Sequence, residues 1–181
     1  MEFPKKKIQL KNGRTAVFRS PAPEDAQGML DFLKTAAGET EFLIRYPEEC
    51  LEDVETEKAF LSNINHSDTN IMILCEMDDR IVGNCHLSYR PRLKLRHRGE
   101  VAIALLRQYW HLGIGTAMFE EMSAQAKELG LEQLELSYIE GNQRARGLYE
   151  KMGFYEVARI PDANRLKDGS MRSDILMMKK L

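Results

Sequence analysis

The stretch that decides the fold reads Val101-Ala102-Ile103-Ala104-Leu105-Leu106 and, after a short polar and aromatic connection, Gly113-Ile114-Gly115-Thr116. The first part predicts an apolar strand, and the second begins a helix with apolar residues on one face: Ala117, Met118, Met122 and Ala126. Glycines let several backbone N–H groups approach a ligand, and a helix N-terminus adds partial positive charge. The turn is therefore a candidate pyrophosphate site. The alternative is that the two glycines only ease tight packing between strand and helix.

A dinucleotide-binding unit is a competing interpretation of this turn. Such a unit has Gly-x-Gly-x-x-Gly near the start of a parallel sheet and an acidic residue about 20 positions later. Met118 stands at the third glycine position, although Glu135 lies at a suitable distance. The turn also follows a predicted hairpin late in the chain. The sequence therefore argues against a nicotinamide or flavin site.

The flanking segments predict further strands and helices. Apolar runs at 71–75 and 81–87 flank Asp78-Asp79-Arg80, a turn-forming cluster typical of an antiparallel hairpin. Other strands are predicted at 15–18, 131–136, 154–158 and 174–178, helices after Ser20 and at 51–64 and 143–152, and a polar loop at 161–170. This order indicates one mixed sheet covered by helices.

A second motif reads Asn142-Gln143-Arg144-Ala145-Arg146-Gly147-Leu148-Tyr149-Glu150-Lys151-Met152-Gly153-Phe154. Asn142 is placed to cap a helix, and a phenol at Tyr149 could present its hydroxyl to a thioester sulfur. The motif resembles the Asn-x-x-Ala-x-x-Leu-Tyr-x-x-x-Gly-Phe signature of the GCN5-related N-acetyltransferase (GNAT) superfamily. Residues 110–115 resemble motif A of the same superfamily, with Trp110 where Arg or Gln is usual.

The resemblance spans about residues 14–178 and implies a fold. That fold is α/β (α+β), with a mixed, mostly antiparallel central sheet of six or seven strands flanked by about four helices. A single acyl-CoA N-acyltransferase domain is expected over residues 1–181, with residues 1–12 as a loose or edge segment.

The resemblance also implies transfer of an acetyl group from acetyl-CoA to a primary amine of a small molecule or peptide, by direct attack in a ternary complex. It implies that acetyl-CoA is bound by Ile103, Ala104, Leu105, His111, Leu112, Gly113, Ile114, Gly115, Thr116, Asn142, Ala145 and Tyr149. The alternative is a non-catalytic regulatory module that binds CoA or acetyl-CoA. Such a module would share Gly113, Gly115 and Asn142 but would need neither Tyr149 nor a base.

Amide formation needs a neutral amine, a proton donor for the departing thiolate and donors at the oxyanion. Tyr149 is the expected general acid by its match to the family's tyrosine, and backbone amides near Leu105 are expected to polarise the carbonyl. Glu100, at the start of the same strand, is the expected general base, and a merely solvated carboxylate is the alternative. His97 and Glu41 are reserve candidates for the base, whereas His86 and His111 are interpreted as surface or packed histidines.

An acidic cluster precedes the second helix. Glu39 and Glu41, with Glu48 and Glu49 nearby, fall in the stretch that corresponds to the family's variable substrate loop. Glu39 and Glu41 are therefore predicted to bind substrate by attracting a cationic amine. A solvated acidic face is the alternative.

Composition limits the remaining classes. With 26 Lys and Arg against 28 Asp and Glu, the net charge of −2 disfavours a nucleic-acid partner. The apolar run at 101–106 is far shorter than the roughly 20 residues of a membrane span, and no secretory leader follows the basic N-terminus. A cytoplasmic protein with no membrane partner is expected. The three cysteines, Cys50, Cys75 and Cys85, are expected to be reduced, and no metal is predicted. The family resemblance suggests a homodimer.

Overall fold

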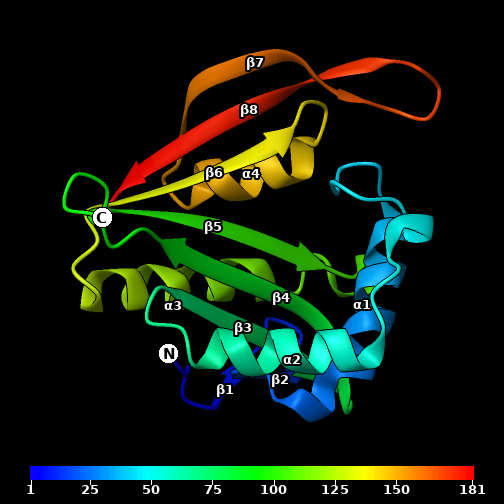
Figure 1. Ribbon diagram of the computed structural model, residues 1–181, viewed down its shortest axis with the longest axis vertical. Helices are drawn as coiled ribbons and strands as arrows, with labels where there is room; N and C mark the ends of the chain where they lie inside the picture. Colours follow the sequence, from blue (N-terminus) through cyan, green and yellow to red (C-terminus); the bar gives the residue numbers. More distant parts are fainter.

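The structure is a computed structural model that describes residues 1–181 (Figure 1). It contains four α-helices, α1 (Ala26–Glu39), α2 (Val54–Asn65), α3 (Ile114–Glu128) and α4 (Gln143–Lys151). Its strands are β1 (Lys6–Gln9), β2 (Thr15–Arg19), β3 (Asn70–Met77), β4 (Arg80–Tyr89), β5 (Arg98–Leu105), β6 (Gln133–Ile139), β7 (Tyr155–Arg165) and β8 (Met171–Lys180). Short 3-10 turns lie at Pro23–Asp25, Pro47–Glu49 and Arg107–Tyr109.

All eight strands form one sheet in the order β1-β2-β3-β4-β5-β6-β8-β7. Every neighbouring pair is antiparallel except β5 and β6, which are parallel. The predicted fold class, with its mostly antiparallel sheet and four helices, is therefore confirmed. The sheet has one strand more than the six or seven expected, because Lys6–Gln9 pairs with Thr15–Phe18 as an edge strand.

The polar loop predicted at 161–170 is wrong over its first half. Strand β7 continues to Arg165, and the pairing with β8 resumes at Asn164 after a register shift. Asp162 adopts a positive φ of 53° within this irregular segment. A bulge of this kind interrupts the two-residue period, so polar residues there resembled a loop.

The two faces of the sheet are covered by different helices. On one face, α1 and α2 bury Met29, Phe32 and Leu61 against Met72 and Leu74 of β3. On the other face, α3 and α4 complete the main core, which includes Met118, Phe119, Tyr149 and Phe154. Figure 1 shows α1 and α2 in front of the sheet and α3 behind it.

The sheet opens between β5 and β6. These strands pair only from Arg98↔Gln133 to Glu100↔Glu135, whereas β5 keeps seven paired positions with β4 and β6 keeps seven with β8. Beyond Glu100 the two strands diverge, as Figure 1 shows. The opening lies beside the turn that leads into α3.

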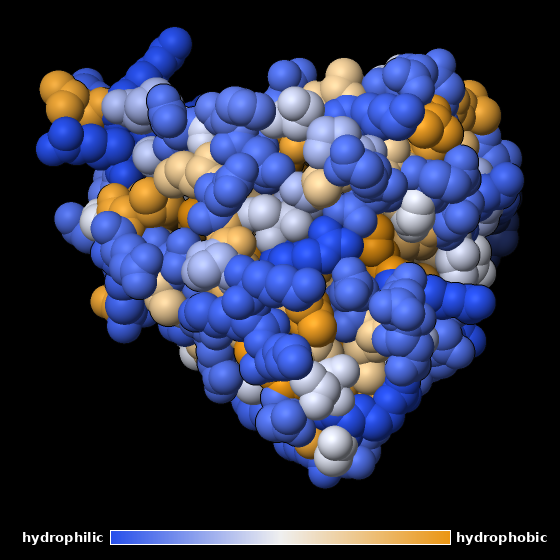
Figure 2. Space-filling view, turned by 90° about the horizontal axis from the view of Figure 1, so that it is seen from below, coloured by the Kyte–Doolittle hydropathy of each residue, from blue (hydrophilic) through white to orange (hydrophobic).

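The outer surface is mostly polar. Figure 2 shows a face on which hydrophilic residues dominate and apolar residues gather only in small patches. None of the four helices is both long enough and apolar enough to span a lipid bilayer.

Candidate active site

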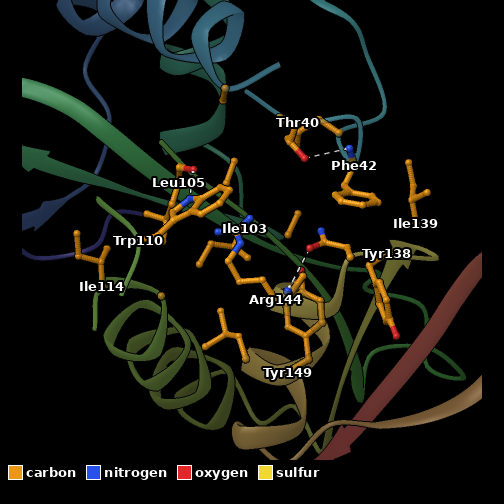
Figure 3. A pocket seen from close by; sticks show the side chains of 18 of the residues that line it. Thr40, Phe42, Ile103, Leu105, Trp110, Ile114, Tyr138, Ile139, Arg144 and Tyr149 are labelled. Atoms are coloured by element: carbon orange, nitrogen blue, oxygen red, sulfur yellow. Dashed lines mark hydrogen bonds between the residues drawn. The ribbon is translucent and has the colours of Figure 1, made fainter. Parts of the chain in front are cut away.

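A cavity of about 500 Å³ occupies the opening between β5 and β6. Its walls come from the end of α1 and the loop after it, from β5, from the first turn of α3, from β6 and from α4. The two halves of the sheet therefore share one cavity, and residues far apart in the sequence meet there. Figure 3 shows Leu105 and Trp110 on one side, Tyr138 and Ile139 on another, and Tyr149 at the base.

The first turn of α3 presents unpaired backbone donors to this cavity. Gly113 adopts a left-handed conformation with φ of 91° and makes no side-chain capping bond. The first helical bond runs from the N–H of Ala117 to the carbonyl of Gly113, at 3.0 Å, so the N–H groups of residues 114–116 precede it. This is the arrangement that binds phosphate groups at a helix N-terminus.

Gly115 allows α3 and α4 to approach closely. A Cβ at this position would lie 2.9 Å from Cδ2 of Leu148 and 3.5 Å from Cδ1 of Leu105. The packing role considered from the sequence is thus confirmed for Gly115, which also contacts α4, whereas the pyrophosphate role of the turn stays a prediction.

Basic side chains surround this turn. Lys151 at the end of α4 donates from Nζ to Oγ1 of Thr116 at 3.1 Å. The side chain of Lys11, after β1, lies near Gly113, where an added Cβ would contact it at 3.7 Å. Arg144 in the first turn of α4 also lines the cavity. The local surroundings of the turn are thus cationic although the whole chain carries a net charge of −2.

Tyr149 lies at the base of the cavity with its ring firmly held. Its ring packs edge-on against Phe119, at a centroid distance of 5.6 Å, and lies 5.8 Å from that of Tyr138. Its hydroxyl makes no hydrogen bond within the protein. Burial raises the pKa of Tyr149 to about 12, although the nearby Arg144 charge opposes this shift. The phenol is therefore protonated at neutral pH and free to donate to a ligand.

Trp110 and Arg144 meet across the cavity (Figure 3). The indole Nε1 of Trp110 donates to the carbonyl of Leu105 at 2.9 Å, and Cζ of Arg144 lies 3.0 Å from the centroid of the indole ring. Arg107 approaches the same ring at 5.5 Å. Trp110 is recognisable in the sequence as a departure from motif A, whereas Arg144 is not, because the two partners lie on separate elements.

Most of the predicted acetyl-CoA residues do line this cavity: Ile103, Ala104, Leu105, His111, Gly113, Ile114, Gly115, Thr116, Asn142, Ala145 and Tyr149. Leu112 does not, because its side chain packs against the main core. Asn142 caps α4 as predicted, since its Oδ1 accepts from the N–H of Ala145 at 3.2 Å.

The predicted base Glu100 lies outside the residues that line the cavity. It is exposed at the last position of β5 that pairs with β6, opposite Glu135 of β6 and Ser88 of β4. Glu135 is itself engaged by the guanidinium of Arg98. Glu100 therefore marks the point at which β5 and β6 separate, whereas Tyr149 lines the cavity itself.

Of the three histidines considered from the sequence, His97 is the reserve candidate for the base, and His86 and His111 are interpreted as packed or surface residues. His86 contacts Oδ1 of Asn70 through Nε2 at 3.0 Å, and burial lowers its pKa, as suits a packed histidine. His97 accepts the N–H groups of Glu132 and Gln133 through its carbonyl. His111 is exposed at the rim with a positive φ of 64°.

The predicted substrate residues lie near the cavity but differ in role. Glu39 lines it, and its Oε2 accepts the N–H of Arg107 at 2.6 Å, which fixes the connection after β5. Glu41 lines only an adjoining shallow hollow.

The far wall of the cavity holds polar groups that the sequence did not reveal. Asp174 of β8 pairs with Ile139 of β6 and lines the cavity. Asn164 of β7 lines it too, and its Nδ2 is buried without a hydrogen-bond partner. Both come from strands that follow the recognised motifs, so only the tertiary structure brings them in. No group of three or more His, Cys, Asp or Glu side chains is arranged to hold a metal ion.

Comparisons with known proteins agree with this geometry. A family model described as the acetyltransferase (GNAT) family matches residues 36–154. A GNAT-family acetyltransferase from Streptococcus pneumoniae is 28% identical, with a TM-score of 0.85 over 92% of this chain and 99% of that chain. A protein from Salmonella typhimurium, solved with its cofactor acetyl-CoA, shares the fold, at 15% identity and a TM-score of 0.75 over 92% of this chain and 94% of that one.

A curated relative gives a shorter match. An N-alpha-acetyltransferase from Sulfurisphaera tokodaii is 43% identical over 58 residues, which are 32% of this chain and 35% of the relative. The aligned region thus spans about a third of that protein's length. The family model covers well over half of the chain, and the sheet, the glycine turn and the tyrosine stand together around one cavity. The chain therefore belongs to the acetyltransferase (GNAT) family.

Proposed function

We propose that this protein is an N-acetyltransferase that transfers an acetyl group from acetyl-CoA directly to a primary amine in a ternary complex. The observation that carries the proposal is one cavity that contains both the uncapped N-terminus of α3 and the free hydroxyl of Tyr149. The N-terminus of α3 can bind a diphosphate, and the hydroxyl of Tyr149 can donate a proton to the departing sulfur.

The distribution of charge around the cavity supports two different ligands. Lys11, Arg144 and Lys151 surround the first turn of α3, where the anionic coenzyme would bind. Two carboxylates, Glu39 and Asp174, line the cavity from other elements, the end of α1 and β8. A carboxylate attracts an ammonium ion and disfavours an anion. This separation favours an amine as the second substrate.

In the proposed mechanism, Tyr149 donates its proton to the sulfur as the carbon–sulfur bond breaks. Its raised pKa keeps that proton available at neutral pH. Glu100 takes a proton from the attacking nitrogen through water as the carbon–nitrogen bond forms. Backbone N–H groups near Leu105 hold the oxygen of the acetyl group. The amine thus loses one proton to Glu100 and the sulfur gains one from Tyr149, so the thiol leaves neutral. Transfer of a proton from Glu100 to Tyr149 through solvent then restores both side chains.

We propose the α-amino group of a peptide as the first acceptor to test, with small primary amines as the alternative. An α-amino group has a pKa of about 7.7–8.0, against about 10.4 for a lysine side chain, so a larger fraction is neutral at pH 7. A base that acts only through solvent, as Glu100 would, is then sufficient. Asn164 offers a buried donor for a peptide carbonyl. The name of the curated relative points to the same class.

Catalysis is tested by release of free thiol from acetyl-CoA in the presence of peptides with free N-termini, polyamines, amino acids and aminoglycosides. Calorimetry with acetyl-CoA alone measures binding separately. Turnover with one acceptor class supports the enzyme. Tight binding with no turnover for any amine would favour the alternative, a regulatory module that binds CoA, and absence of binding would overturn both.

The oligomeric state and location are also proposals. Strand β7 is an edge strand with exposed apolar side chains, and Tyr155, Val157 and Ile160 are about half exposed. We propose that two copies pair through this surface to form a homodimer, which light scattering after gel filtration would test. A cytoplasmic location stays a prediction from the sequence.

A further inference from the structure

Position 110 holds neither of the residues, Arg or Gln, that the resemblance to motif A leads one to expect. The indole of Trp110 is neutral, and it is fixed by its Nε1 bond to the carbonyl of Leu105. Fixing the indole there keeps its face turned toward the cavity, where Arg144 meets it at 3.0 Å. Tryptophan is the best aromatic partner for a guanidinium. The stack therefore holds a cation from α4 beside the position where motif A usually has Arg or Gln.

The charge of Arg144 has no counter-ion within the protein. None of the ion pairs includes Arg144, although eleven are formed elsewhere in the chain. Burial lowers the pKa of Arg144, and the nearby charge of Arg107 lowers it further. An arginine remains charged even so. Glu39 and Asp174 line the same cavity, but neither forms an ion pair with Arg144. A cation without such a partner is stabilised when an anion binds beside it.

We propose that Arg144, held on the face of Trp110, binds the diphosphate of acetyl-CoA and takes the place of the Arg or Gln side chain that is absent from position 110. This inference rests on the proposed function, because it takes acetyl-CoA as the ligand. It goes further in assigning a specific residue of α4, from outside motif A, to the phosphate groups. The guanidinium can donate two parallel hydrogen bonds to phosphate oxygens, while the N–H groups of residues 114–116 supply the others.

The chain offers a matched control for this assignment. Arg146 lies two residues further along α4, is exposed, and is paired with Glu150 at 2.7 Å. Arg144→Ala and Arg146→Ala remove the same charge from the same helix. Only the first should weaken binding of CoA, by about 10- to 100-fold, which is the usual range for a hydrogen bond to a charged group.

Two ligands identify which phosphate is involved. Dephospho-CoA lacks the 3′-phosphate but keeps the diphosphate, so calorimetry should show the same fold-loss for CoA and dephospho-CoA in Arg144→Ala. A loss confined to CoA would assign Arg144 to the 3′-phosphate and overturn the proposal. Equal affinity of Arg144→Ala and the unmodified protein for both ligands would overturn it as well.

A rescue experiment separates a binding role from a structural one. The double variant Trp110→Arg with Arg144→Ala restores a cation at position 110, and we expect it to recover most of the lost affinity. A fold defect caused by loss of the stack would not be rescued. Trp110 is the only tryptophan, so its fluorescence in Arg144→Ala shows independently whether the indole keeps its environment. If the unmodified protein does not bind CoA at all, the proposed function fails; if it binds and the variants behave alike, only this inference fails.

Discussion

Replacing Tyr149 with phenylalanine isolates the proposed proton donor from everything else that the residue does. The ring contributes to the main core through edge-on contacts with Phe119 and Phe154, at centroid distances of 5.6 and 6.3 Å. Phenylalanine keeps these contacts. The change therefore removes one oxygen atom and leaves the shape of the site intact.

The size of the two effects follows from the hydroxyl's surroundings. Because the hydroxyl makes no hydrogen bond within the protein, its removal costs none, and we expect the free energy of unfolding to change by less than about 0.5 kcal/mol or to rise slightly. Loss of a general acid lowers the turnover number by roughly 10²- to 10⁴-fold, which corresponds to about 3–5 kcal/mol in the transition state. Catalysis and stability should thus respond very differently.

Turnover is measured by thiol release at saturating acetyl-CoA with the best acceptor. Stability is measured separately by urea unfolding, and binding by calorimetry with acetyl-CoA. Phe119→Leu is the control for packing, because it disturbs the same aromatic cluster without touching the hydroxyl; it should lower stability more than turnover. If Tyr149→Phe keeps the turnover number within a factor of about three while binding acetyl-CoA normally, Tyr149 is not the acid.

Three further predictions concern the turn, the core and the base. Gly113→Ala strains a residue in the left-handed conformation, so calorimetry should show weaker acetyl-CoA binding and urea unfolding should show a free energy of unfolding lower by about 1 kcal/mol. Gly147→Ala is the control: it lies in open space on α4, and the free energy of unfolding should rise by a similar amount. Burial raises the pKa of Cys75 from 9.0 to about 12, so the stability contributed by the neutral thiol is complete below pH 9 and is lost as the pH rises toward 12. The free energy of unfolding should therefore fall by about 2–3 kcal/mol between pH 9 and 11. The fall should be smaller in Cys75→Ala. Glu100→Gln should lower the turnover number by roughly 10²-fold, and Asp174→Asn should chiefly raise the KM of the acceptor; the reverse pattern in steady-state kinetics would exchange their roles.

The strand-and-helix order could be predicted from the sequence because local signals agreed with the tertiary structure. Three of these signals depend only on residues that are close in the sequence: the glycine turn, the cap at Asn142 and the alternation of β6. Edge strand β1 gave no clear signal, since its alternation of exposed and half-buried residues covers only four positions. The length of β7 was hidden by its bulge.

The candidate site could be predicted only where one motif contained it. Gly113, Gly115 and Tyr149 belong to recognisable patterns, and the structure brings all three to one cavity. Arg144 and Asp174 carry charges that any surface residue could carry. Arg144 is significant because it stacks on the Trp110 ring, and Asp174 is significant because the pairing of β8 with β6 brings it to the cavity. Neither of these contacts corresponds to a fixed spacing in the sequence.

The opening in the sheet is a property of the pairing and needs no ligand to form. The N–H of Leu106 donates to the carbonyl of Val82, so alternate residues of β5 are hydrogen-bonded to β4 and the intervening ones, Ile103 and Leu105, direct their backbone groups toward β6. Beyond Glu100, β6 is too far away to receive them. An unpaired strand edge binds an extended chain with amide groups, as the pantetheine arm of acetyl-CoA is. The carbonyl of Leu105 is already taken by Trp110, so the indole ends this edge on the side of the diphosphate. In the proposed complex with acetyl-CoA, the same side chain that fixes Arg144 would therefore also set where the pantetheine stops pairing and the phosphates begin.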